Sequence, residues 1–143
     1  MRTIGEAIKV LASIQPQTIT VNNGDTSGET VIDTLGFDNV CFVIVAGNGT
    51  FVDETYSFQV YENAASNTTS GHTAITSAVA AITGDNTVKK IQVSGLGTGS
   101  RKRYMFVRCT TTGSNESLPC TAIAILGPAI GELNPVQAVN VSV

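Results

Sequence analysis

The chain has one histidine, His72, and a catalytic role for it is the first possibility to weigh. It lies in the polar stretch 66–73, and the only carboxylate within ten residues on either side is that of Glu62. A hydrolytic triad needs a nucleophile and a carboxylate around the histidine, and no sequence motif that would present such a nucleophile occurs here. We therefore expect His72 to be an exposed loop residue and predict no catalytic residue.

Carboxylates occur in two groups that a metal ion could use. Asp25, Ser27 and Glu29 place oxygens at alternating positions in a glycine-containing loop, but three oxygens are far from a complete calcium loop. Asp53 and Glu54 form a pair that fits a solvated loop tip better than a general acid and base. One histidine and three scattered cysteines without a C-x-x-C pair do not make a zinc site. We predict no metal and no cofactor.

A glycine-rich run, Gly95-Leu96-Gly97-Thr98-Gly99, resembles part of a phosphate-binding loop. It lacks the Lys-Ser/Thr ending of that motif, and the residues from Arg103 onward have the pattern of a strand instead of the required helix. A turn between two strands is the better interpretation of this run.

Basic residues are concentrated in one predicted hairpin. Lys89, Lys90, Arg101, Lys102 and Arg103 are five of the eight basic residues of a chain whose net charge is −3 and whose pI is about 4.9. A nucleic-acid surface would add aromatic side chains and a net positive charge, so we exclude nucleic acid as a partner. The hairpin fits a contact with an acidic protein surface, and an ordinary solvated hairpin is the alternative.

The elements that must position these residues are strands. Thr, Val and Ile supply 19, 16 and 12 of the 143 residues, and such β-branched side chains favour a pleated sheet. Short apolar runs separated by turn residues predict an all-β, antiparallel β-sandwich of about eight strands, of the jelly-roll or Greek-key kind. The predicted strands are 18–21, 30–35, 39–46, 56–61, 73–82, 87–93, 103–111 and 121–126. For 73–82 a helix is the alternative, because Ile75, Val79 and Ile82 also fit one helical face, but its threonines and the flanking glycines favour a strand.

The first 16 residues have a different pattern from the rest. Ile4, Ile8, Leu11 and Ile14 are spaced by four, three and three residues, which predicts one apolar face of a short helix that ends at Pro16. A helix this short needs a surface to pack on. We expect either a cap on the sandwich or an arm that contacts a partner, followed by a sandwich domain over residues 17–127.

Two further segments bear on the arrangement of the chain. The run 40–45 is apolar at every position, which predicts a central strand between two layers. Residues 128–143 form a predicted extended tail in which Val139, Val141 and Val143 alternate with polar residues. Fully extended, these 16 residues reach about 50 Å, and such an ending could add a strand to a sheet edge of its own chain or of a neighbour.

The cysteines and the N-terminus bear on the cellular compartment. Cys109 and Cys120 would face each other in a hairpin centred on Ser114-Asn115, so a disulfide is conceivable, although two buried free thiols are the favoured interpretation. The N-terminus has no continuous apolar run typical of a signal peptide, and no run is long enough to span a membrane. We expect the chain to be made and retained in the cytoplasm, without a membrane partner.

Four stretches of the chain together resemble a known class of protein. They are TVIDTLGFDNVCFVIVAG, FQVYEN, SRKRYMFVRCTTTG and TAIAILGPAIGELNP, in this order. Over residues 18–135 the chain is similar to small virion proteins of tailed bacteriophages, several of which act as capsid decoration or cement proteins. The resemblance implies a β-sandwich, commonly trimeric, that binds the outside of an icosahedral head and stabilises it by bridging major capsid subunits.

The resulting hypothesis is a non-enzymatic viral structural protein whose partners are the major capsid protein and further copies of itself, in a trimer or else a dimer. The alternatives are a tail or head–tail component of the virion and a carbohydrate-binding module for host adhesion. The absence of tryptophan and the presence of only three tyrosines weigh against the carbohydrate-binding module. The predicted partner-contact residues are Ile4, Ile8, Leu11, Lys89, Lys90, Arg101, Lys102, Arg103, Val139, Val141 and Val143.

Overall fold

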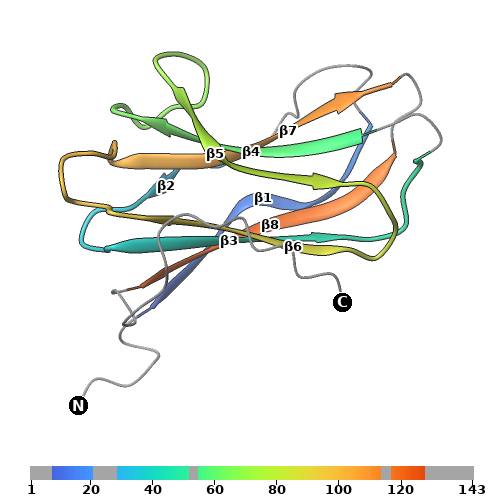
Figure 1. Cartoon of the computed structure of the whole chain (residues 1–143), viewed down its shortest axis with the longest axis horizontal. Helices are drawn as coiled ribbons and strands as arrows, with labels where there is room; N and C mark the ends of the chain where they lie inside the picture. The colour runs from blue at the N-terminus through green and yellow to red at the C-terminus, as the bar shows by residue number, and fades with distance from the viewer. Residues whose placement is uncertain (1–7, 21–28, 52–54, 114–116, 128–143) are drawn as a thin grey trace.

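The computed structural model describes residues 8–20, 29–51, 55–113 and 117–127, and these form two packed antiparallel sheets of four strands each (Figure 1). The strands are β1 (Lys9–Ile19), β2 (Ile32–Asp33), β3 (Asn39–Ala46), β4 (Thr55–Asn63), β5 (Thr73–Ile82), β6 (Val88–Ser94), β7 (Tyr104–Thr112) and β8 (Leu118–Gly127). Sheet A has the order β1-β8-β3-β6, and sheet B has the order β2-β7-β4-β5. The predicted all-β sandwich of about eight strands is confirmed.

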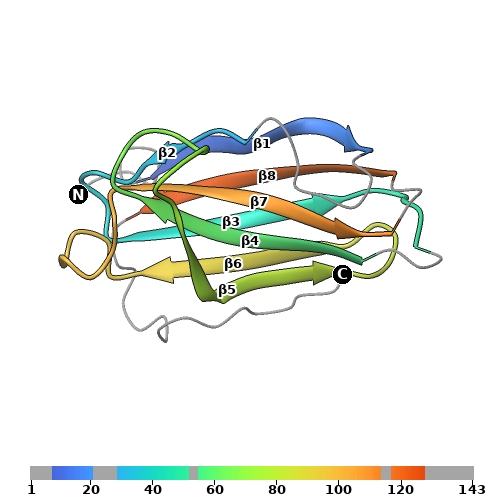
Figure 2. The ribbon, with the colours of Figure 1, turned by 90° about the horizontal axis from the view of Figure 1, so that it is seen from above.

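The strand order identifies the sandwich as a jelly roll. β1 pairs with β8, β2 with β7, β3 with β6 and β4 with β5, which is the pairing of one long hairpin rolled up into two layers. Additional pairing of β3 with β8 and of β4 with β7 completes the two sheets. Figure 2 shows the strands of the two layers lying nearly parallel to one another along the long axis.

The core lies between the sheets and is filled by alternate residues of the strands. In β4, Tyr56, Phe58 and Val60 are fully buried, and Ser57 and Gln59 point to the other side of the sheet. The same alternation runs through β3 and β8, so one face of each sheet supplies the core. The predicted bounds of β3 and β5 are confirmed, and β2, β4, β6, β7 and β8 lie within a few residues of their predicted positions, whereas β1 begins nine residues before the predicted strand 18–21.

The predicted N-terminal helix is wrong over the residues that the structure describes. Residues 9–16 belong to β1, an edge strand of sheet A, and the first two residues of the predicted strand 18–21 are the end of that same element. Leu11 pairs with Ala124 and Ile14 with Ala122, so three residues of β1 span only two of β8. This β-bulge turns both side chains inward at a spacing of three, which imitates the period of a helix. Pro16 sits in a second register shift of the same edge strand, where a missing N–H is tolerated.

A buried serine joins the edges of the two sheets. The Ser13 hydroxyl accepts a hydrogen bond from the Val107 amide at 2.9 Å and donates one to the Thr30 carbonyl at 3.3 Å. The Thr30 amide in turn donates to the Ser13 carbonyl at 2.7 Å, and Ile14 forms an isolated bridge with Glu29. Because Val107 belongs to sheet B and Ser13 to sheet A, the sandwich is closed by hydrogen bonds along this edge.

Candidate functional site

The beginning of β1 and the end of β8 lie at the same end of the sandwich. Lys9 pairs with Leu126, and Gly127 pairs with Asn39, so the segments before β1 and after β8 attach side by side in sheet A. The β2–β3 turn (34–38) and the β6–β7 loop (95–103) lie at the same end, on the left in Figure 1. We call this region the termini end.

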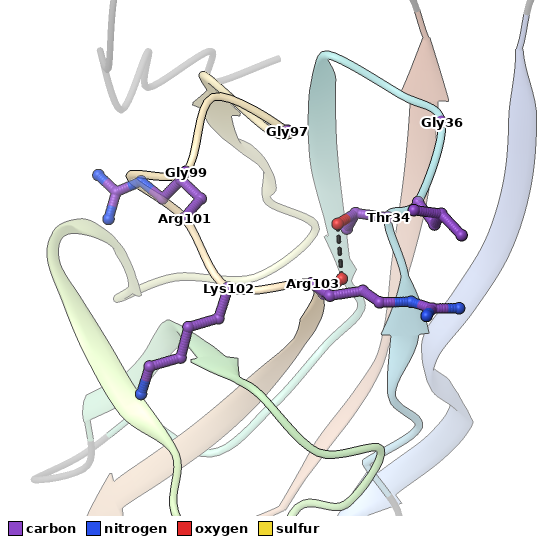
Figure 3. Close-up of a pocket in the computed structure, with 8 residues that line it drawn as sticks. Thr34, Gly36, Gly97, Gly99, Arg101, Lys102 and Arg103 are labelled. Atoms are coloured by element: carbon purple, nitrogen blue, oxygen red, sulfur yellow. Dashed lines mark hydrogen bonds between the residues drawn. The ribbon is translucent and has the colours of Figure 1, made fainter.

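A hollow of about 250 Å³ lies at the termini end between the β2–β3 turn and the β6–β7 loop (Figure 3). Its lining residues are Thr34, Leu35, Gly36, Gly97, Gly99, Arg101, Lys102 and Arg103. Gly36 and Gly97 have φ values of +87° and +79°, a left-handed conformation that favours glycine over any other residue. Thr34 ties the two loops together, because its amide and its hydroxyl both donate to the Arg103 carbonyl, at 3.0 and 2.6 Å.

The three basic residues of this loop do not converge on one point. Figure 3 shows the side chains of Arg101, Lys102 and Arg103 pointing in three different directions. Arg101 lies 3.7 Å from the Glu62 carboxylate, and the Lys102 ammonium donates to the Thr73 hydroxyl at 2.9 Å. The loop therefore presents several locally bonded cations, and not a cluster that closes around one anion.

Arg103 forms the best-defined ion pair of the termini end. Its guanidinium donates two hydrogen bonds to the Asp33 carboxylate, at 2.8 and 2.7 Å, and stacks 5.0 Å from the centre of the Tyr104 ring. These bonds, together with one from the Leu35 amide, lower the pKa of Asp33 from 3.8 to about 2. The pair is about half exposed, so water screens much of its attraction.

The predicted basic hairpin does not form. β6 belongs to sheet A and β7 to sheet B, so the segment between them crosses from one layer to the other. Lys89 and Lys90 pair with Ile44 and Val43, four to five residues before the end of β6 at Ser94. At about 3.3 Å per residue, this separates them from the loop by about 15 Å along the strand. The sequence alone could not reveal this crossing, because strand and turn signals do not indicate the sheet to which each strand belongs.

A second polar cluster, centred on Arg108, was missed by the sequence analysis. The Arg108 guanidinium donates to the Glu29 carboxylate and to the Thr68 carbonyl, both at 2.8 Å, and lies over the rings of Tyr61 and Phe106. The Arg108 and Glu29 side chains are only 13% and 7% exposed. Arg108 thus fastens the segment before β2 and the β4–β5 loop onto the outer face of sheet B.

His72 belongs to this cluster, although we expected it to be exposed. Its ring packs edge-on against Tyr61 and Phe106, and its Nε2 lies 3.4 Å from an Arg108 guanidinium nitrogen. An arginine nitrogen can only donate, so this contact needs an unprotonated Nε2. The buried Nδ1 has no hydrogen-bond partner within the described chain. His72 is therefore a half-buried side chain that packs against two aromatic rings and lies beside the Arg108 guanidinium.

The remaining candidate ligands are placed only in part. Asp25 and Ser27, and the pair Asp53 and Glu54, lie outside the described residues. Glu29, the third of the loop oxygens considered and rejected as calcium ligands, is bonded to Arg108. No group of three or more potential metal ligands occurs among the described residues. The described part of the chain contains no helix that is long and apolar enough to cross a membrane.

The three cysteines form no disulfide with one another and lie in two environments. Cys109 and Cys120 are buried in the core, and they do not face each other in a hairpin because β7 and β8 lie in different sheets. Burial raises the pKa of the Cys120 thiol to about 12. Cys41 lies on the outer side of β3, where it is half-buried and where burial also raises its pKa.

The other predicted partner-contact residues divide between described and undescribed parts of the chain. Ile8, directly before β1, and Leu11, within it, are half-buried, and Leu11 packs against the core. Ile4 and the three valines of the tail, at positions 139, 141 and 143, lie outside the described residues. Their contact with a partner stays a prediction. The chain matches no protein-family model, and no curated protein is significantly similar to it.

Proposed function

We propose that this protein is a non-enzymatic virion component that decorates and stabilises the head of a tailed bacteriophage. The observation that carries the proposal is the attachment of both terminal segments at the same end of a closed jelly roll. Such a domain can place two apolar-patterned segments side by side against a neighbouring subunit, and its two-layer core keeps the attachment points rigid.

The fold and the four-part resemblance given above agree with this role. Jelly rolls of eight strands occur in viral capsid proteins, as well as in lectins and cupins, so the fold alone does not assign the function. On the outside of a head, each weak contact is repeated at every equivalent position. A protein bound through two segments at once therefore gains avidity without needing a deep pocket.

In this proposal the major capsid protein is the partner, and the outer capsid surface is the location. The segments that bind it contain Ile4 and the valines at 139, 141 and 143, with Ile8 directly before β1. Arg101 and Lys102 stand at the same end and would add a salt-sensitive contact at the edge of the interface. Assembly takes place in the host cytoplasm.

Binding to heads that lack this protein tests the proposal. The full chain is compared with a variant that carries Val139→Asp and Val141→Asp, and with a matched variant that carries Asn140→Asp and Ser142→Asp. We expect the wild type and the matched variant to saturate the heads at a fixed ratio to capsid subunits, and the valine variant to bind at least tenfold more weakly. Equal binding of all three chains would contradict the role of the valines.

Two further results would contradict the proposal as a whole. One is failure of the wild type to bind heads together with its detection on tails, which would favour a tail or head–tail component. The other is specific binding of the purified chain to an immobilised glycan, which would favour the adhesion module.

A further inference from the structure

The outer face of sheet A, on the side away from the core, is mainly apolar on β1, β8 and β3, whereas the edge strand β6 contributes Gln92 and Lys90 beside Val88. The pairing of the strands places its side chains in four rows. Three are mainly apolar, namely Val10–Ile125–Cys41–Gln92, Ala12–Ile123–Val43–Lys90 and Thr121–Val45–Val88. The fourth, Gly127–Asn39–Ser94, is the polar border of the face at the termini end. Val10 and Val45 are 55% and 40% exposed, and the interior positions Ile123, Ile125 and Val43 are half-buried.

The outer face of sheet B is built differently. Ser57, Gln59 and Arg108 lie there, and the β4–β5 loop with His72 covers part of it. Sheet B therefore has the polar outer side that is usual for one layer of a sandwich. Sheet A has an apolar one, and none of the described elements packs beyond it (Figure 1).

The apolar outer face of sheet A explains why the run 40–45 is apolar on both sides of its strand. Its alternate residues Val40, Phe42 and Ile44 are buried in the core, whereas Cys41, Val43 and Val45 point outward. The sequence predicted a strand between two layers, and the described chain provides one of them. A second layer on the outer side would account for the other half of the pattern.

The dimensions of the face favour a second sheet as that layer. Eight residues of β3 at about 3.3 Å each give a length of about 26 Å, and four strands about 4.8 Å apart give a width of about 19 Å. The resulting area is about 500 Å², so two such faces would together bury about 1000 Å², the lower limit of specific interfaces. A single extended segment, about 4.8 Å wide by the same spacing, would cover only about a quarter of the width.

The position of Lys90 on this face also fits a second sheet as the partner. Lys90 is the one charged side chain in the four rows, and it lies on the edge strand β6. In a face-to-face pair of sheets it would remain at the solvated rim, while the apolar centre around Ile123 and Val43 loses contact with water. Interfaces between copies commonly have this arrangement of an apolar centre and a polar rim.

We propose that the outer face of sheet A is a self-association surface, on which a second copy of this chain packs the same face about a two-fold axis. This goes beyond the proposed function, because it assigns the contact between copies to one face and one symmetry. It also leaves the segments that attach at the termini end available for a different partner.

The solution mass of paired variants tests this surface. Val45→Asp places a charge in the proposed interface, and Val79→Asp places the same charge on β5 in sheet B, at a valine that is similarly exposed, 37% against 40%. Both positions are at the surface, so both variants should fold. In sedimentation equilibrium we expect the wild type and Val79→Asp to associate as pairs. We expect Val45→Asp to dissociate at least a hundredfold more readily, because an unpaired carboxylate would have to be buried.

Cys41 supplies a second readout in the unmodified chain. It is the one thiol on this face, because Cys109 and Cys120 are buried in the core. We expect its alkylation to be slow at high protein concentration, faster on dilution, and fast at all concentrations in Val45→Asp.

Three results would overturn the proposal. The first is a wild-type monomer with a freely reactive Cys41. The second is a monomer with a protected Cys41, which would show that the chain covers its own face. The third is an oligomer that Val45→Asp leaves intact. All these measurements use the purified chain, so failure of the proposed capsid role would not affect them.

Discussion

The ion pair of Glu29 with Arg108 gives the sharpest test of how this sandwich is stabilised. The two side chains are 2.8 Å apart and only 7% and 13% exposed, so removal of one leaves the other charged and largely without water. Loss of one partner from a buried pair typically costs about 3–5 kcal/mol, and we take the lower end because some exposure remains. Glu29→Ala should therefore lower the free energy of unfolding by about 3 kcal/mol. With an unfolding entropy of about 2.1 cal/mol/K per residue over 143 residues, the midpoint should fall by about 10 °C.

The assay is urea unfolding of the full chain, with a double-mutant cycle that adds Arg108→Met. Methionine retains much of the contact with the Tyr61 and Phe106 rings but carries no charge. We expect the double variant to be more stable than the sum of the two single losses predicts, by about 2 kcal/mol. Asp33→Ala, which removes a partner from the half-exposed pair with Arg103, is the control and should cost far less. Strictly additive losses, or a loss below about 1 kcal/mol for Glu29→Ala, would refute the reasoning.

Two further predictions concern pH and packing. Because the pKa of Asp33 is lowered from 3.8 to about 2 by Arg103, the native chain binds fewer protons than the unfolded chain in this interval. The stability from this pair should be complete above about pH 4 and disappear as the pH falls to about 2, a trend that Asp33→Asn should lack in acid unfolding curves. A Cβ added at Gly49 would lie 2.7 Å from Leu118 Cδ1, whereas one at Gly84 would meet nothing within 4 Å. Gly49→Ala should therefore lower the stability by about 1–3 kcal/mol and Gly84→Ala by much less, and equal thermal midpoints would contradict this.

Much of the strand content could be predicted because it depends on local pattern. The bounds of β3 and β5 follow from β-branched and apolar runs that end at glycine or polar turn residues. The helix predicted for the first 16 residues failed because spacing alone is ambiguous. A bulge in β1 lets Leu11 and Ile14 both face the core, and the partner strand that establishes this register lies more than 100 residues away.

The candidate sites depended far more on the tertiary structure. Lys90 and Arg101 are near in sequence, yet they belong to different regions because the chain changes sheets between them. Conversely, Glu29, His72 and Arg108 are scattered along the sequence, and only the rolled-up pairing of the strands brings them together on sheet B. No local signal marks such a cluster, since its members are separated by 36 residues or more in the sequence.

By itself, the sequence determined the fold class, most strand positions and the two-sided apolar character of the run 40–45. These properties follow from side-chain shape and alternation over a few residues. Only the tertiary structure decided the jelly-roll order, the separation of the basic residues and the common end at which both terminal segments attach. The physical reason is that these features depend on hydrogen bonds between strands far apart in the chain, such as β1 with β8. Their register is set by burial of one face of each sheet against the other.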